Sequence, residues 1–287
     1  MTQAQLDAQY DQRTAVPHVQ DYAHRWDRWS EELRAGRRFE TLRYGPGACE
    51  LLDLFVPAGP EVAHLHIHGG AWRALSRTAA GFTVRGLDHG RTAVAIADFA
   101  LAPEASLGQM VAEVRRAFLW LRDWAGARGI RVAVSGHSSG GHLAACLLHR
   151  GWWSETGLGP EDFAGVLLAS GIYDLVPVRL SARNGYLHLA DEDVAALSPL
   201  TNLPERLPPL AVVWGEHELD EFRRQSRCYA EATAGRAAWH HLEELKGLNH
   251  FDVYDAFGDP ASPIGRLART LTRGAGTDAQ GQQGEPE

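Results

Sequence analysis

A serine between two glycines stands near the middle of the chain, in the segment GHSSG at 136–140. The segment fits the pattern G-x-S-x-G, directly after an apolar run at 130–134 and directly before a predicted helix at 141–149. On such a strand-to-helix turn the glycines leave room for strained backbone, so the Ser138 hydroxyl projects above the edge of a sheet. The first N–H group of the following helix, that of Ser139, favours a developing oxyanion. The pattern predicts that Ser138 is a nucleophile; the alternative, a phosphate-binding turn, lacks the lysine and spacing of phosphate-binding patterns.

A second glycine turn lies upstream, where the segment HGGAW at 68–72 ends an apolar strand. Backbone N–H groups in such a turn can donate to the negative oxygen of a tetrahedral intermediate. We expect these oxyanion donors among Gly69, Gly70 and Ala71, together with Ser139. The sequence does not decide which of them point inward.

Three histidines, His64, His66 and His68, alternate along the strand before this turn. Alternate residues of a strand share one face, so they offer a second hypothesis, a zinc site of the His-x-His kind. A central strand is buried on both faces, however, and the sequence identifies no carboxylate that would complete the site. We therefore expect no metal and no cofactor, and we expect the His68 ring to brace the glycine turn.

A general base and an acid are predicted downstream of the serine. His250 follows the last predicted strand, in a loop, and is the candidate base. Four carboxylates occupy the segment 215–222, which follows another strand. A spacing of three residues after the glycine selects Glu218 as the acid, and Asp220, which can instead cap the following helix, is the alternative. The order Ser138, Glu218, His250 matches a Ser…Asp/Glu…His triad.

Strands and helices alternate along the chain, and their order indicates how these residues are positioned. Short apolar runs of strand length alternate with segments of helical periodicity. Such alternation is typical of an α/β fold, in which a mostly parallel, twisted sheet carries helices on both faces. The predicted strands are 51–56, 62–67, 93–97, 130–134, 165–169, 210–214 and 239–245, and the predicted helices are 106–125, 141–149, 220–234 and 264–271.

The predicted strands and helices lie within one domain at residues 1–273. Residues 1–35 are expected to form a helical arm that packs on the body of the protein, because apolar residues recur there at roughly helical spacing. The segment at about 175–209 is long and contains prolines, which is typical of a lid over a pocket. Residues 274–287 have no apolar residue beyond alanine and are expected to be a disordered tail.

The composition excludes several classes of protein. Of the 287 residues 45% are hydrophobic and 22% are charged, which is the composition of a globular protein. The net charge of −8, with no basic cluster, argues against a nucleic-acid or anionic-membrane partner. Three widely spaced cysteines and the lack of an apolar leader or spanning segment favour a cytoplasmic protein. The sequence does not decide between a monomer and a homodimer.

The chain resembles the α/β-hydrolase fold and, within it, the kynurenine formamidase (arylformamidase) branch, from about residue 6 to residue 272. The glycine turn and the serine segment are shared with many carboxylesterases, and three later segments are more particular to this branch. The segments that carry the resemblance are YDQR at 10–13, HGGAW at 68–72, LAPE at 101–104, GHSSGGHLAA at 136–145, SGIYDL at 170–175, EFRRQS at 221–226 and NHF at 249–251.

The resemblance implies hydrolysis of an N-formyl aromatic amide to formate and an aromatic amine, without a cofactor. The substrate would then be a small aromatic amide or ester, and we expect an aromatic wall around it formed by Trp72, Phe99, Tyr173 and Tyr186. Ala71 stands where an aromatic residue is common in the branch, which leaves the acyl group open. A carboxylesterase, or a specialised amidase or thioesterase of the same fold, is the alternative, and a non-catalytic scaffold is a third hypothesis.

Overall fold

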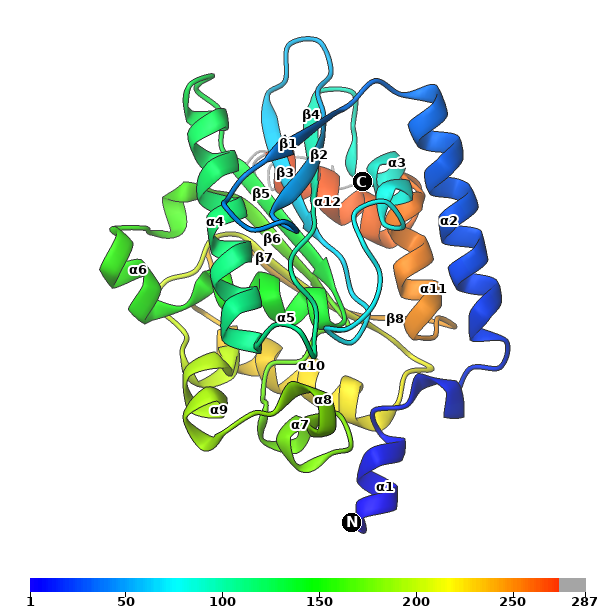
Figure 1. Ribbon diagram of the computed structural model, residues 1–287. Coiled ribbons are helices and arrows are strands. Elements are labelled where there is room, and N and C mark those ends of the chain that lie inside the picture. Colours follow the sequence, from blue (N-terminus) through cyan, green and yellow to red (C-terminus); the bar gives the residue numbers. More distant parts are fainter. Residues whose placement is uncertain (274–287) are drawn as a thin grey trace, which may run out of the picture.

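Eight strands form one sheet in the computed structural model, which describes residues 1–273 (Figure 1). The tail predicted at 274–287 lies outside the described residues. The strand order is β1-β2-β4-β3-β5-β6-β7-β8; β1 and β2 run antiparallel to their neighbours, and β3 to β8 are parallel. The strands are β1 Glu40–Arg43, β2 Leu51–Phe55, β3 Val62–Ile67, β4 Thr92–Ala97, β5 Val132–His137, β6 Phe163–Ala169, β7 Leu210–Gly215 and β8 His240–Leu245.

Twelve α-helices are present in residues 1–273, and most of them connect or cover the strands. Ser106 caps the longest helix, α4, as its hydroxyl accepts a hydrogen bond from the Gln109 N–H. The helices are α1 Gln3–Ala8, α2 Val19–Gly36, α3 Val84–Leu87, α4 Leu107–Gly126, α5 Ser139–Ala145, α6 Arg150–Thr156, α7 Val176–Leu180, α8 Asn184–Leu187, α9 Asp191–Leu197, α10 Asp220–Thr233, α11 His250–Asp255 and α12 Pro263–Arg273. Short 3₁₀ turns lie at Gln12–Thr14, Gly81–Thr83, Cys146–Leu148, Pro160–Asp162, Pro199–Thr201 and Ala256–Gly258.

The sheet divides the core into two layers. Successive residues of a strand point to opposite faces, so Leu65 and Ala95 contribute to one apolar cluster, while Val94 and Ile96 contribute to the other. The first cluster includes side chains of α4, α5, α6 and α10, and the second includes side chains of α2, α3, α11 and α12 (Figure 1). The central strands are buried on both faces, which explains why they read as continuous apolar runs.

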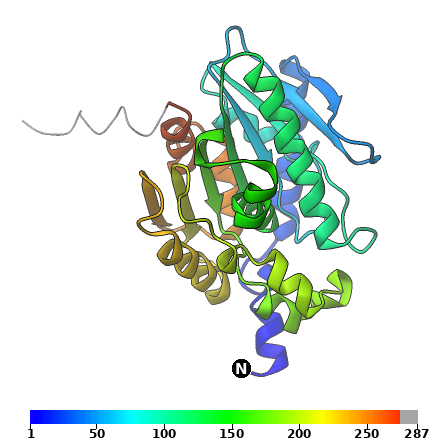
Figure 2. The same ribbon diagram turned by 90° about the vertical axis from the view of Figure 1, so that its left-hand side faces the viewer.

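The N-terminal arm is helical, and it packs on the body of the protein. Its second helix, α2, lies against α11, and Trp26 of α2 is 5% exposed and lies edge-on to Tyr254 of α11. Its first helix, α1, lies beside the segment at 175–209, where Gln3 donates to the Leu180 carbonyl and Asp7 accepts from the Ala182 N–H (Figure 2). The arm therefore joins two parts of the chain that are distant in sequence.

The predicted strands and helices are confirmed to within about four residues. The short helices α3, α6, α7, α8, α9 and α11 were not predicted, and among the strands β1 was missed. This strand is short and polar, and three of its four residues are exposed, so it lacks an apolar pattern. The architecture is the mostly parallel, twisted α/β sheet with helices on both faces that the alternation of strands and helices predicts. Among the helices within residues 1–273, none has both the length and the apolar character needed to cross a bilayer.

Candidate active site

Ser138 lies on a sharp turn between β5 and α5. Its backbone angles, φ 57° and ψ −124°, lie outside the regions that most residues adopt. The turn requires both flanking glycines, because a Cβ at Gly136 would come 2.2 Å from the Gly140 carbonyl oxygen and a Cβ at Gly140 would come 2.2 Å from that of Ile67. The side chain of Ser138 is thereby held above the carboxyl edge of the sheet.

His250 reaches Ser138 from α11. Its Nε2 lies 3.0 Å from the Ser138 Oγ. The prediction that His250 lies in a loop is wrong, because it is the first residue of α11. Asn249 caps that helix by accepting hydrogen bonds from the N–H groups of Phe251 and Asp252. The helix fixes the position of the imidazole more tightly than a loop would.

Glu218 completes the set on the other side of the ring. Its Oε2 lies 3.1 Å from the His250 Nδ1, while its Oε1 accepts hydrogen bonds from the Gly215 N–H, at 2.7 Å, and from the Ser170 hydroxyl. The alternative acid, Asp220, begins α10 with its side chain 86% exposed, beside Arg223, and does not reach His250. The structure thus brings together Ser138, His250 and Glu218, which are all about 95% buried.

Ser170 is a site residue that the sequence reasoning missed. It follows the last residue of β6, so its hydroxyl lies at the carboxyl edge of the sheet, next to the turn after β7. A signal was present, since polar residues directly after neighbouring parallel strands meet at this edge.

Two rings hold the imidazole of His250 from its sides. Phe222 of α10 lies edge-on to it at a centroid distance of 4.7 Å, and His137 lies at 4.6 Å. Burial, and then the proximity of His250, hold the pKa of His137 well below its usual value, so this ring is neutral. Its Nε2 lies 3.0 Å from the His250 carbonyl oxygen, which makes it a donor to that oxygen.

The glycine turn after β3 lies beside Ser138. A Cβ at Gly69 would come 3.3 Å from that of Ser138, and the next three residues have positive φ angles of 103°, 54° and 60° at Gly70, Ala71 and Trp72. The Trp72 N–H donates to the Ser139 hydroxyl. The N–H groups of Gly69, Gly70, Ala71 and Ser139 have no hydrogen-bond acceptor within residues 1–273. These four are the predicted oxyanion donors.

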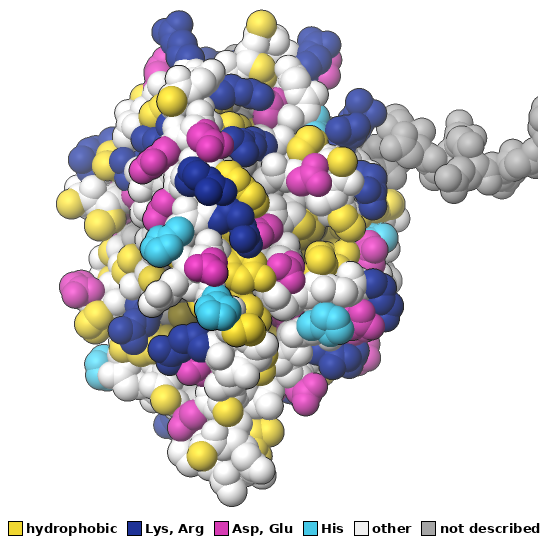
Figure 3. Space-filling view, turned by 90° about the vertical axis from the view of Figure 1, so that its right-hand side faces the viewer, with side chains coloured by type: hydrophobic (Ala, Val, Ile, Leu, Met, Phe, Trp, Pro, Cys, Tyr) yellow, Lys and Arg dark blue, Asp and Glu magenta, His cyan; other side chains and the backbone are white. Residues whose placement is uncertain are grey.

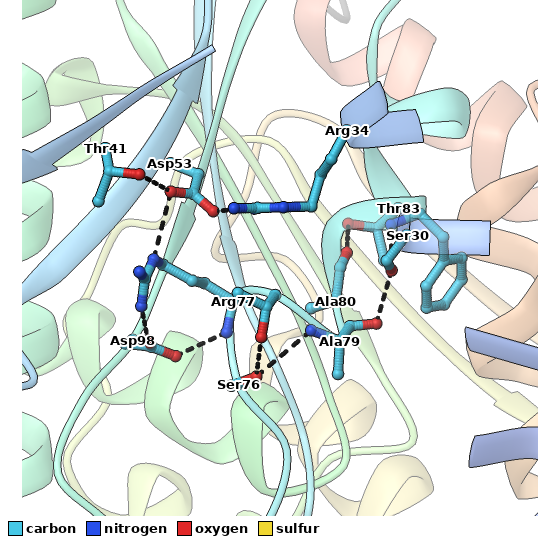
Figure 4. Close-up of polar contacts among 12 residues, drawn as sticks. Ser30, Arg34, Thr41, Asp53, Ser76, Arg77, Ala79, Ala80, Thr83 and Asp98 are labelled. Atoms are coloured by element: carbon cyan, nitrogen blue, oxygen red, sulfur yellow. Dashed lines mark hydrogen bonds and ion pairs between the residues drawn. The ribbon is translucent and has the colours of Figure 1, made fainter. Parts of the chain in front are cut away.

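A network of charged residues adjoins this turn through His68, and Figure 4 shows its members Asp53, Arg77 and Asp98. Its centre is Asp53 of β2, which is fully buried and binds Thr41, Arg34 of α2 and Arg77. Arg77 also pairs with Asp98. The Asp98 carboxylate lies 3.6 Å from the His68 Nε2, while the Nδ1 of that ring hydrogen-bonds the Gly69 carbonyl. His68 therefore braces the glycine turn, as predicted.

The three alternating histidines do not form a metal site. The His64 Nε2 and the His66 Nδ1 both hydrogen-bond the Ser135 hydroxyl, at 2.8 and 2.9 Å, whereas His68 is bound to the glycine turn. Within residues 1–273 no group of three His, Cys, Asp or Glu side chains is arranged to hold a metal ion. The zinc hypothesis therefore has no ligand set in this part of the chain.

A cavity of about 760 Å³ opens over Ser138 and His250, a volume within the range of small-molecule sites. Its walls come from the N-terminal arm, the glycine turn, the segment at 182–186 and α11. The lining residues are Asp7, Ala8, Tyr10, Asp11, Gln12, Arg13, Thr14, Val19, Trp26, Gly70, Ala71, Arg73, Ala74, Leu75, His137, Ser138, Ala182, Arg183, Tyr186, His250, Phe251 and Tyr254.

Of the four aromatic residues predicted to form the substrate wall, the structure places Tyr186 at the cavity and the other three away from it. Tyr186 lines the cavity and donates to the Ala71 carbonyl. Trp72 is fully buried, because the positive φ angles of the glycine turn direct its indole toward His142, to which it donates. Phe99 stacks on His68 and Tyr173 stacks on Tyr229, so both lie in the core rather than on the cavity wall.

The arm supplies the part of the wall that the sequence reasoning missed. Tyr10 and Trp26 line the cavity, although both are 5% exposed. The Tyr10 hydroxyl donates to Glu221, and its ring lies edge-on to Phe222, which in turn contacts His250. Burial, and then the charge of Glu221, raise the pKa of Tyr10, which stays protonated. The segment YDQR at 10–13, which is part of the family resemblance, was the available signal for this role of the arm.

A second cavity of about 580 Å³ lies between α6 and the segment at 200–205. Arg150, Trp153 and Arg236 are among its lining residues, and it contains none of the predicted site residues. The chemistry of Ser138 therefore belongs to the larger cavity.

Comparison with known proteins identifies the relatives of this chain. A family model described as the alpha/beta hydrolase fold matches residues 64–184. Kynurenine formamidase of Salmo salar is 31% identical over 231 residues, which are 76% of either chain, and that of Drosophila melanogaster is 26% identical over 250 residues, 83% of either chain.

Solved structures resemble the chain over nearly its whole length. The crystal structure of a provisionally assigned thioesterase from Silicibacter has a TM-score of 0.82 at 25% identity and covers 92% of this chain and 98% of its own. An esterase of Pyrobaculum calidifontis has a TM-score of 0.70 at 20% identity, with 95% and 98% covered, which shows the fold alone. The chain therefore belongs to the α/β-hydrolase family, in the branch of the kynurenine formamidases, and it is a hydrolytic enzyme.

Proposed function

We propose that the protein is an arylformamidase, which hydrolyses an N-formyl aromatic amide to formate and an aromatic amine through a Ser138–His250–Glu218 triad. One observation carries the proposal. The Ser138 hydroxyl, the His250 imidazole and the Glu218 carboxylate form an unbroken chain of contacts of 3.0 and 3.1 Å under the free N–H groups of the glycine turn. The relatives named kynurenine formamidase support the choice of substrate.

In the proposed reaction Ser138 attacks the formyl carbon while His250 accepts the proton of its hydroxyl. Glu218 holds the Nδ1–H tautomer of the imidazole and stabilises the imidazolium. The negative oxygen of the tetrahedral intermediate receives hydrogen bonds from Ser139 and the glycine turn, each worth about 3 kcal/mol of transition-state stabilisation. His250 then protonates the amine as the C–N bond breaks. A water molecule, deprotonated by His250, releases formate from the formyl-serine and regenerates the hydroxyl.

The surroundings of Ser138 suit a small acyl group and a large aromatic leaving group. The glycine turn lies directly beside the serine, with Gly69 close to its Cβ. The rings of Tyr10, Trp26, Tyr186 and Phe251 line the wider cavity, and aromatic rings favour aromatic ligands. We further propose that the segment at 175–209, together with the arm, forms a lid over the bound substrate.

Hydrolysis of N-formylkynurenine, compared with a series of p-nitrophenyl esters, tests the proposal. We expect kcat/KM for the formamide to reach roughly 10⁴ M⁻¹s⁻¹ or more and to exceed that for the esters. Ser138→Ala should lower kcat by several orders of magnitude for every substrate, with the circular dichroism spectrum unchanged. If the protein hydrolyses short esters but not the formamide, the assignment changes from an arylformamidase to a carboxylesterase that uses the same triad. Full activity of Ser138→Ala would overturn the triad itself.

A further inference from the structure

Arg183 occupies an unusual position in the wall of the cavity. It precedes α8 and is partly buried, with its guanidinium carbon 5.2 Å from the ring centroid of Tyr10 and 5.8 Å from those of Trp72 and Phe222. These three rings surround the cation on its apolar sides. Burial lowers the pKa of this guanidinium, but an arginine remains charged throughout the physiological range.

The hydrogen bonds of Arg183 are incomplete. Its Nη2 donates to the Tyr10 carbonyl at 2.7 Å, whereas its Nη1 is buried and has no acceptor within residues 1–273. A buried charged donor without an acceptor costs folding free energy, so it requires an explanation such as a ligand that supplies the acceptor. Arg183 forms no ion pair with a carboxylate of the described residues, although it lines the cavity that contains Ser138.

The acidic residues of the cavity wall are already engaged elsewhere. Asp11 binds Arg13 through both carboxylate oxygens, at 2.7 Å each. Asp7 accepts hydrogen bonds from Gln3 and from the Ala182 N–H. Neither acid forms an ion pair with Arg183, although the charge of Asp11 acts on the guanidinium from a greater distance.

A second arginine of the wall is also free. Arg73 is exposed, and its side chain makes no hydrogen bond or ion pair with residues 1–273. Its guanidinium carbon lies 4.7 Å from the ring centroid of Tyr186, whose phenol contacts the Ala71 carbonyl in the glycine turn. Arg183 directly precedes the helix α8, which contains Tyr186, and both arginines line the cavity.

We propose that Arg183, assisted by Arg73, binds a carboxylate on the leaving group of the substrate, so that the enzyme selects anionic aromatic amides. A planar guanidinium with free donors matches the two oxygens of a carboxylate. The carboxylate belongs to the leaving group because the acyl group at Ser138 is small. Arg183 lies close to the catalytic histidine. The ring centroid of Phe222 is 5.8 Å from the Arg183 guanidinium carbon and 4.7 Å from the ring centroid of His250. The inference rests on the proposed function and adds a specificity-determining residue to it.

The test compares N-formylkynurenine with its carboxamide, in which only the carboxylate is replaced by a neutral group. For the wild type we expect the carboxamide to have a KM about 10-fold or more above that of the acid, with a similar kcat. Arg183→Gln should raise the KM of the acid by a similar factor and leave the KM of the carboxamide within about twofold. Arg183→Lys, which keeps the charge, should restore part of the preference.

Arg179→Gln is the matched control, because Arg179 lies in the same segment at 175–209 but outside the cavity lining and is paired with Asp191; it should leave both KM values unchanged. An equal KM for the two substrates in the wild type would overturn the inference. A KM that rises equally for the acid and the carboxamide in Arg183→Gln, but not in Arg183→Lys, would also overturn the inference. Arg183 would then only support the Tyr10 backbone.

Failure of the proposed function is distinguishable from failure of this inference. If the wild type hydrolyses neither compound, the proposed function fails, and calorimetric titration with 4-phenylbutanoate and 4-phenylbutanamide still tests Arg183. Tighter binding of the carboxylate, lost in Arg183→Gln, would support the assignment. Equal binding of the two compounds would overturn it.

Discussion

Glu218 is held by two hydrogen bonds besides its contact with His250. The Gly215 N–H and the Ser170 hydroxyl both donate to its Oε1, which leaves Oε2 directed at the Nδ1 of the imidazole. Asp220, two residues later, faces solvent and pairs with Arg223. The two carboxylates therefore differ in access to His250, although both lie in the same short segment.

This difference leads to a prediction for two conservative variants. Glu218→Gln should lower kcat about 10²- to 10⁴-fold, because a neutral amide no longer stabilises the imidazolium. Asp220→Asn should change kcat less than about threefold. Steady-state kinetics with the best formamide or ester substrate measure both. A larger loss in Asp220→Asn than in Glu218→Gln would show that the acid is assigned wrongly.

At the scale of elements, α2 and α11 are joined by polar contacts around Tyr22. The Tyr22 hydroxyl donates to Asp252 at 2.8 Å and accepts from the Asn249 side chain at 3.0 Å. Asn249 is the residue that caps α11 directly before His250. The arm thus stabilises the helix start from which the imidazole reaches Ser138.

Tyr22→Phe removes these two hydrogen bonds and keeps the ring. We expect it to lower the free energy of unfolding by about 1–2 kcal/mol, and also to lower kcat, because α11 loses support at its first turn. Tyr254→Phe is the matched control, since the Tyr254 hydroxyl is buried and has no partner within residues 1–273; it should leave both quantities unchanged or raise stability slightly. Urea unfolding and steady-state kinetics provide the two readouts. Equal effects of the two variants would contradict this role of the arm.

The glycine turn depends on the tertiary structure in a similar way. The network of Asp53, Arg77 and Asp98 adjoins it through His68 and takes its members from β2, from the loop after the turn and from the end of β4 (Figure 4). Arg34 of α2 joins the same network at Asp53. The arm therefore supports both halves of the site, the donors and the base.

The whole molecule carries its charges in a mixed pattern at the surface and keeps several histidines in the interior. Viewed from the side of α2, acidic and basic side chains alternate across the face, with no large region of one sign (Figure 3). Inside, His64, His66, His137 and His142 are buried. Burial lowers the pKa of His64 to about 3 and that of His142 to about 4.

These buried histidines predict how stability depends on pH. Their pKa values lie below that of an unfolded histidine, about 6.5, so the unfolded chain binds protons first as the pH falls. The contribution of these histidines to the free energy of unfolding is therefore complete above pH 6.5. It falls below that pH by about 1.4 kcal/mol per pH unit for each such histidine.

His64→Gln should reduce this slope between pH 6 and pH 4 by about one proton, as measured by urea unfolding at several pH values. The exposed His24 on α2 offers the control, and His24→Gln should leave the slope unchanged. A wild-type stability that stays constant between pH 7 and pH 4 would contradict the prediction.

The sequence alone predicted the α/β fold, the strand-to-helix turn at Ser138, the histidine that contacts this serine, and a carboxylate in the segment 215–222 as the acid. These features depend on local patterns, such as apolar periodicity, glycines at a sharp turn and polar residues directly after strands, so neighbouring residues determine them.

The tertiary structure decided the rest. The choice between Glu218 and Asp220, the burial of Trp72, Phe99 and Tyr173, and the place of His250 in a helix depend on contacts between distant segments. The arm and Arg183 became part of the cavity for the same reason, because α1 and α2 pack on elements more than 170 residues away. Local periodicity shows which face of an element is apolar, but only packing decides what that face contacts.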